Sequence, residues 1–153
     1  KIEPEVKKDE DPVFDHLPLR FAEFKSKVQQ DGLLLAEAPD ELRKNRTLVK
    51  LAVQNNGWAL EFLEEFQDDE EIVKWAVQQN GYALQFASAN LQNHFTIVKW
   101  AVQQNGYALQ FAGDQLRKNK AEMRKLVELA VMGDGLALEF APKDVQNNRK
   151  IVK

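Results

Sequence analysis

Sixteen consecutive residues of this sequence occur twice without a change. Residues 72–87 read IVKWAVQQNGYALQFA, and residues 97–112 read the same letters again, 25 positions later. A unit this short cannot bury its own apolar side chains, so neighbouring copies must pack on one another. The repeat therefore predicts a stack of similar units.

Weaker copies flank the identical pair, and each carries a glycine. The intervals between successive glycines are 25, 24, 25 and 29 residues, for Gly32, Gly57, Gly81, Gly106 and Gly135. The four extra residues of the last interval are about one helical turn, which lengthens a helix and keeps its buried face roughly in place. We therefore expect a longer helix in the last copy.

The apolar positions of each copy recur at helical spacing on two segments. We expect an all-α fold in which αα-hairpin repeats of about 24 to 25 residues stack into a short solenoid. In the copy that starts near Asp69, the first helix ends near Asn80 and the second continues to Leu91. Residues on both segments should be buried where repeats meet: Ala76, Val77, Leu84, Ala101, Val102 and Leu109.

The expected helix ends have recognisable sequence signals. Short polar residues that can cap the first helix stand in equivalent places: Asn45, Asp69, Asn119 and Asn148, with His94 in the third copy. Asn119 is followed by Glu122 at capping-box spacing. Asn-Gly pairs end the same helix, so we expect Gly81 and Gly106 to be C-terminal caps with positive φ.

The chain divides into a lead-in and an array. Residues 1–16 are charged, contain two prolines and lack periodicity, so we expect a flexible segment. Residues 17–153 form the array. It comprises a divergent first repeat at 17–38, repeats at about 39–66, 67–91, 92–116 and 117–145, and the start of another at 146–153. Because the chain begins with Lys1 and ends inside a repeat, we expect a fragment of a longer protein.

Composition limits the classes of function. The formal charge of −3 argues against a dedicated nucleic-acid binder, and the lack of cysteine excludes disulfides and thiolate metal sites. No apolar run approaches the roughly 20 residues of a membrane span, and no signal-peptide pattern is present. A cytoplasmic location fits these features.

The repeat pattern I-V-x-x-A-V-x-x-N-G-x-A-L-x-F-A resembles an uncharacterised repeat family, catalogued as a domain of unknown function. Its members occur mainly in intracellular bacteria that live in amoebae, and in some protists. The match covers about Gly32 to Lys153 and is strongest in the two middle copies. The resemblance implies a helical array inside a larger effector-like protein, and the host-cell cytoplasm as its location if it is secreted. It implies no reaction.

The sequence contains no constellation of catalytic residues. His16 and His94 have no second histidine at ligand spacing, and neither a phosphate-binding glycine loop nor a nucleophile elbow is present. The acidic run at 68–71 fits the first turn of a helix, where the helix dipole favours negative charge. We therefore expect no enzymatic activity, no cofactor and no metal.

Two series of polar residues align from copy to copy on the outer face of the first helix. They are the lysines Lys50, Lys74 and Lys99 and the glutamines Gln54, Gln78 and Gln103. Stacking would place them side by side as a ladder, which is either a docking face or ordinary solvated helix surface. Trp75 and Trp100 edge the buried arc and would anchor a partner if they are partly exposed.

A second aromatic series, Trp58, Tyr82 and Tyr107, follows the glycines and favours packing between repeats. The leading functional hypothesis is a protein–protein interaction scaffold, with another protein as the partner. The alternative is a reader of nucleic acid or another anionic ligand. It would use these aromatics and the basic clusters at 43–50 and 117–125. An enzyme and a structural spacer are weaker alternatives.

Overall fold

The computed structural model describes residues 17–133, 139 and 143–146, and within this part of the chain every regular element is a helix. The α-helices are α2 (Leu17–Gln30), α3 (Asp40–Arg43), α4 (Arg46–Asn55), α5 (Glu70–Gln79), α6 (Ala89–Gln92), α7 (Phe95–Gln104), α8 (Asp114–Lys118), α9 (Lys120–Gly133) and α10 (Lys143–Gln146). The 3₁₀ helices are η1 (Gly32–Glu37), η2 (Gly57–Phe62), η3 (Glu64–Phe66), η4 (Gly81–Phe86) and η5 (Gly106–Phe111). The predicted all-α class is confirmed.

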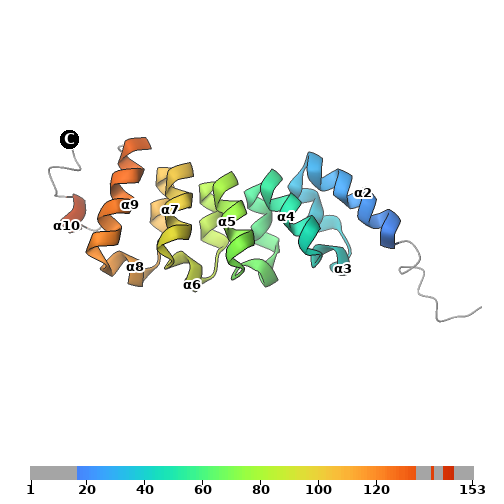
Figure 1. Ribbon diagram of the computed structural model, residues 1–153, viewed down its shortest axis with the longest axis horizontal. Coiled ribbons are helices and arrows are strands. Elements are labelled where there is room, and N and C mark those ends of the chain that lie inside the picture. Colours follow the sequence, from blue (N-terminus) through green and yellow to red (C-terminus); the bar gives the residue numbers. More distant parts are fainter. Residues whose placement is uncertain (1–16, 134–138, 140–142, 147–153) are drawn as a thin grey trace, which may run out of the picture.

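The longer helices form one row. Each of α2, α4, α5, α7 and α9 contacts the next, and Figure 1 shows them side by side with α3, α6 and α8 along one edge. The 3₁₀ helices η1, η2, η4 and η5 also contact one another in order, and each packs against its own long helix and the following one. The described helices therefore form two layers, α and 3₁₀.

The second half of each unit differs from the continuous helix that we expected. In the best-matched copy, η4 ends at Phe86, Ala87 is extended (φ −67°, ψ 154°), and α6 begins at Ala89. The side-chain amide of Gln92, at the end of α6, donates to the carbonyls of Leu84 and Gln85. These bonds satisfy backbone acceptors in the last turn of η4. Apolar spacing did not reveal the break because Leu84 and Leu91 are buried on both sides of it.

The expected starts of the long helices are confirmed at three positions. Asn45 accepts hydrogen bonds from the N–H groups of Thr47 and Leu48, Asp69 accepts from Ile72, and Asn119 accepts from Glu122. His94 has the same extended backbone but makes no side-chain capping bond. Asn148 lies outside the described residues.

The insertion in the last copy lengthens a helix, as predicted. Helix α9 has 14 residues, whereas α4, α5 and α7 have 10 each. The extra turn precedes the buried positions Leu126 and Val127, which correspond to Ile97 and Val98 of α7. The buried face therefore keeps its register.

The prediction of left-handed glycines is wrong, because no described glycine has a positive φ. Gly81 opens a 3₁₀ helix, and the preceding Asn80 closes α5 in an extended conformation. A Cβ atom built on Gly81 would come closer than 3.0 Å to the carbonyl oxygen of Ala101 in the next unit. The same clash arises between Gly57 and Ala76, so these glycines permit the close approach of adjacent units.

The core runs along the whole row. All six residues that we expected to be buried are at most 2% exposed, which confirms this prediction. Within the described residues, no polar or charged residue is fully buried. Alanines in the core, such as Ala76 and Ala101, leave room for the 3₁₀ helix of the preceding unit.

Candidate interaction surface

Lysines and tryptophans alternate across the row of long helices, from α4 to α7. The ammonium nitrogen of Lys50 lies 5.3 Å from the ring centre of Trp75 in the next helix, and that of Lys74 lies 4.7 Å from the ring centre of Trp100. Lys74 is also 5.9 Å from Trp75 of its own helix. We call this series the Lys–Trp strip: Lys50, Trp75, Lys74, Trp100 and Lys99.

Packing fixes the strip in place. Both tryptophans are half-buried against the core, and all three lysines are half-buried as well. The indole nitrogen of Trp75 is buried and has no hydrogen-bond partner within the described residues, so packing rather than hydrogen bonding holds this ring. A lysine that covers an indole face gains a cation–π contact of about 0.5–2 kcal/mol, which restricts its side chain.

The glutamines of the predicted ladder are arranged differently. Gln54, Gln78 and Gln103 are exposed, and no side-chain hydrogen bond holds them. The residue after each of them is engaged instead. Asn55 and Gln79 accept from the N–H groups of Gly32 and Gly57 at 2.7 and 2.5 Å, and Gln104 accepts from Gly81. Each of α4, α5 and α7 therefore ends with two neighbouring side-chain amides, and the second of them bonds to the preceding unit.

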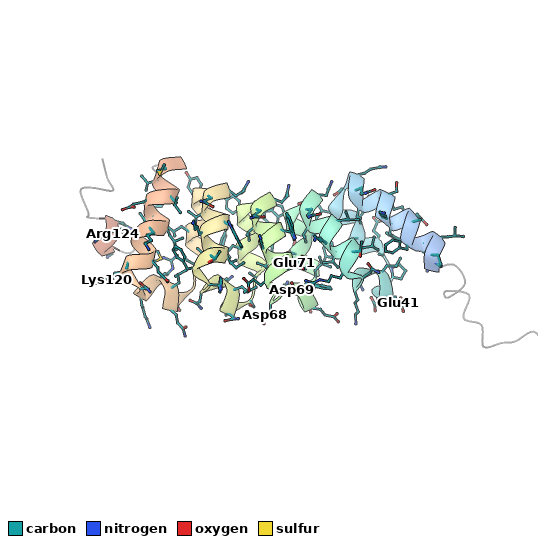
Figure 2. The ribbon with its side chains drawn as sticks, viewed as in Figure 1. Glu41, Asp68, Asp69, Glu71, Lys120 and Arg124 are labelled. Carbon is teal, nitrogen blue, oxygen red and sulfur yellow. The ribbon has the colours of Figure 1, made fainter. Side chains whose placement is uncertain are left out.

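An ion-pair network adjoins the first lysine of the strip. Arg46 in α4 pairs with Asp69 at 2.5 Å and with Glu71 at 2.6 Å, and Lys50 reaches Glu71 at 3.3 Å. Asp69 and Glu71 are labelled in Figure 2, near the middle of the row. Hydrogen bonds from Arg46 lower the pKa of both carboxyls and raise the pKa of Arg46 itself. The network ties α4 to α5.

The first basic cluster is neutralised by carboxylates of this chain. Arg43 pairs with Asp40, Lys44 pairs with Glu65 at 2.9 Å, and the pairs of Arg46 and Lys50 are described above. In the second cluster, Arg117 donates to the carbonyls of Leu109, Gln110 and Ala112 and so closes η5. Lys120 and Arg124 lie on α9, at the opposite end of the row from Glu41 (Figure 2).

The aromatic residues after the glycines contact the next unit. Trp58 meets Phe86 edge to face with ring centres 5.3 Å apart, and Tyr82 meets Phe111 in the same way at 6.2 Å. The corresponding partner of Tyr107 would be Phe140, which lies outside the described residues. These contacts support the packing interpretation, although Trp58 remains 38% exposed.

One hollow was not anticipated. Its volume is about 320 Å³, and it lies between α3 and η3 with Phe62, Leu63 and Phe66 in its lining. In this unit a three-residue 3₁₀ turn replaces the four-residue helix found in α3 and α6. The glycine interval of 24 residues was the sequence signal for this shorter connector. The basic residues in its lining, Arg43 and Lys44, are paired with Asp40 and Glu65.

The described residues contain no group of three or more histidine, aspartate or glutamate side chains placed to hold a metal ion. None of their helices combines the length and apolar character needed to cross a bilayer.

The described chain is thus an all-helical repeat protein with a cationic and aromatic strip on its long helices. The family model described as Domain of unknown function (DUF4116) matches residues 24–67 and 69–117, which together are more than half of the sequence. The chain belongs to this family. No curated protein and no solved structure matches this chain.

Proposed function

We propose that this chain is a protein-interaction scaffold in which stacked helical repeats form a short solenoid and dock another protein on the Lys–Trp strip. The observation that carries the proposal is the state of Lys74 and Lys99. Within the described residues, neither forms an ion pair with a carboxylate. Both side chains are half-buried, on helices α5 and α7, which also carry Trp75 and Trp100. Tryptophan is enriched in binding hot spots, and a lysine beside it can add charge complementarity to an acidic partner.

The proposed test compares two double variants that change the net charge equally. Lys74→Glu with Lys99→Glu reverses the strip, and Lys25→Glu with Lys118→Glu reverses two exposed lysines of α2 and α8. Each variant and the wild-type chain are immobilised separately and used to capture proteins from cell lysate. Each captured protein is then purified, and its affinity for the three immobilised chains is measured. We expect at least one direct partner to be lost with the strip variant and kept with the control. The control variant should keep the wild-type melting temperature, because exposed substitutions shift stability by under about 0.5 kcal/mol. The strip variant also loses the contact of Lys74 with Trp100, which contributes about 0.5–2 kcal/mol, so circular dichroism must show that it is folded at the capture temperature.

Retention of every direct partner by the strip variant would contradict this proposal. The alternative function, binding of nucleic acid, is supported by the exposed basic residues Lys118, Lys120, Arg124 and Lys125 of α8 and α9. It is weakened by the first basic cluster, which is neutralised internally. Binding to a single-stranded oligonucleotide that falls steeply with salt, and that depends on α9 rather than on the strip, would favour this alternative.

The family resemblance is the only support for placing this array in a larger effector-like protein, and we propose that setting on this basis. The partner would then be a host protein, and the chain would act in the host-cell cytoplasm.

A further inference from the structure

The charge beside the Lys–Trp strip changes sign along the row. One position of the repeat, two residues before the first buried valine, is Glu71 in α5, Thr96 in α7 and Lys125 in α9. In α5 this position neutralises Lys50. In α7 and α9 this position offers no carboxylate, and within the described residues neither Lys74 nor Lys99 forms an ion pair.

The strip ends at α7. In α9 the lysine and tryptophan positions are taken by Glu128 and Leu129. The unpaired cationic part of the strip is therefore short: it consists of the half-buried Lys74 and Lys99 on two adjacent helices, with the exposed Lys125 following at the edge. Only a small number of negative groups can be matched there.

The ammonium group of Lys74 is positioned by a tryptophan of the next repeat. Lys74 is held over Trp100 at 4.7 Å, so its nitrogen leans toward the next helix. An ammonium group has three donors, and contact with one ring face leaves donors for a carboxylate. Because the side chain is already restricted, binding loses less conformational entropy than it would at a free lysine.

The spacing of the strip selects the shape of its ligand. Packed helices lie 8–10 Å apart, and Lys74 and Lys99 occupy the same position on the contacting helices α5 and α7. A polyproline II segment has three residues per turn and rises 3.1 Å per residue, so every third side chain lies on one face about 9.3 Å apart. We propose that the strip binds an extended acidic peptide whose carboxylates recur at every third residue. This inference rests on the proposed scaffold function.

A nucleic-acid strand fits the strip less well. Stacking of bases needs free aromatic faces, but Lys74 lies over a face of both Trp75 and Trp100. Glu70 and Glu71 also border the strip and would repel a continuous chain of phosphates. A peptide with a carboxylate at every third residue brings fewer negative charges near these acids than a strand with a phosphate at every nucleotide.

The test uses two labelled synthetic peptides of identical composition. Each contains two glutamates among prolines and alanines, but one peptide places the glutamates three residues apart and the other places them next to each other. We expect the wild-type chain, at low ionic strength, to bind the spaced peptide about tenfold more tightly than the clustered one, which corresponds to about 1.4 kcal/mol. Lys74→Gln with Lys99→Gln should abolish this preference, and Lys25→Gln with Lys118→Gln should retain it.

Equal affinity for the two peptides, no binding of either, or the same loss in both double variants would overturn the inference. Competition by a single-stranded oligonucleotide that binds the strip more tightly than the spaced peptide would overturn it as well. The scaffold proposal would still stand if the capture experiment found a strip-dependent partner whose docking segment lacks the spaced acids. In that case only the inferred peptide chemistry is wrong.

Discussion

The side-chain oxygen of Gln104 accepts a hydrogen bond from the backbone N–H of Gly81, which belongs to the preceding unit. Asn55 and Gln79 make the same bond to Gly32 and Gly57. A built Cβ atom on each of these three glycines would collide with a carbonyl oxygen of the same neighbouring helix. Adjacent units are therefore joined by one repeated contact, in which close approach and hydrogen bonding depend on each other. Gly133 takes the glutamine position in α9 and has no side chain to make this bond.

Replacement of Gln104 by leucine should destabilise the chain. The substitution keeps most of the side-chain volume but leaves the partly buried N–H of Gly81 without its acceptor, at a cost of about 1–3 kcal/mol. The matched control is Gln103→Leu, because Gln103 is the adjacent exposed residue without this bond, and its change should stay under about 0.5 kcal/mol. Urea unfolding monitored by circular dichroism measures both. Equal effects at the two positions would contradict the proposed link.

Replacement of Gly81 by alanine should also destabilise, by about 1–3 kcal/mol, because the new methyl group meets the backbone of Ala101. Gly133→Ala is the control, since nothing lies within 4 Å of a Cβ built there. It should leave stability unchanged or raise it by up to about 1 kcal/mol. Gly81→Asn distinguishes a glycine needed for close approach from a glycine needed for a left-handed helix cap. Asparagine can adopt the left-handed conformation, but its side chain would still meet the backbone of Ala101. Near-wild-type stability of that variant would argue for the cap.

Replacement of His94 by asparagine should stabilise the chain. His94 occupies the capping position of α7 with φ −86° and ψ 111°, close to the φ −86° and ψ 109° of Asp69, yet its side chain makes no capping bond. Asparagine at this position can accept from the first turn, which contributes about 0.5–2 kcal/mol. The reciprocal control, Asn45→Ala, should lose a similar amount. Thermal unfolding that shows no gain for His94→Asn would mean that the first turn of α7 is satisfied in another way.

The sequence predicted the features that depend on periodicity. Buried alanines and valines recur at helical spacing, and capping residues precede them, so Ala76, Val102, Asn45 and Asp69 could be placed correctly from the pattern alone. The lengthened α9 followed from one interval between glycines. These features are local, and neighbouring residues in the chain determine them.

Features that depend on contact between units could not be predicted in the same way. The pattern Asn-Gly is common to left-handed caps and to a 3₁₀ start, and only the position of Ala101 in the next unit distinguishes them. Likewise, Gln104 bonds to Gly81 and Gln103 does not, and this difference depends on the position of the neighbouring unit. For the candidate site, the pattern aligned Lys74 with Lys99, but it could not show that Lys74 covers Trp100 while Glu71 neutralises Lys50.

The ion-pair network of α4 and α5 predicts a dependence of stability on pH. The pKa of Asp69 is lowered from 3.8 and that of Glu71 from 4.5, in both cases chiefly by hydrogen bonds from Arg46. A lowered pKa in the folded state favours the ionised carboxylate, so its contribution is fully present above the unfolded-state values. The contribution is lost as the pH falls through the folded-state values.

We therefore expect the free energy of unfolding of the wild-type chain to decrease as the pH is lowered from about 5 to about 2. Arg46→Gln should flatten this decrease, because it removes the partner that lowers both pKa values, and the two proteins should become closer in stability at the acidic end. Arg124→Gln is the matched control, since Arg124 is exposed and forms no ion pair within the described residues. Its curve should run parallel to that of the wild type. Urea unfolding at each pH gives the curves, and a curve for Arg46→Gln parallel to that of the wild type over the whole range would show that the network does not couple proton binding to folding.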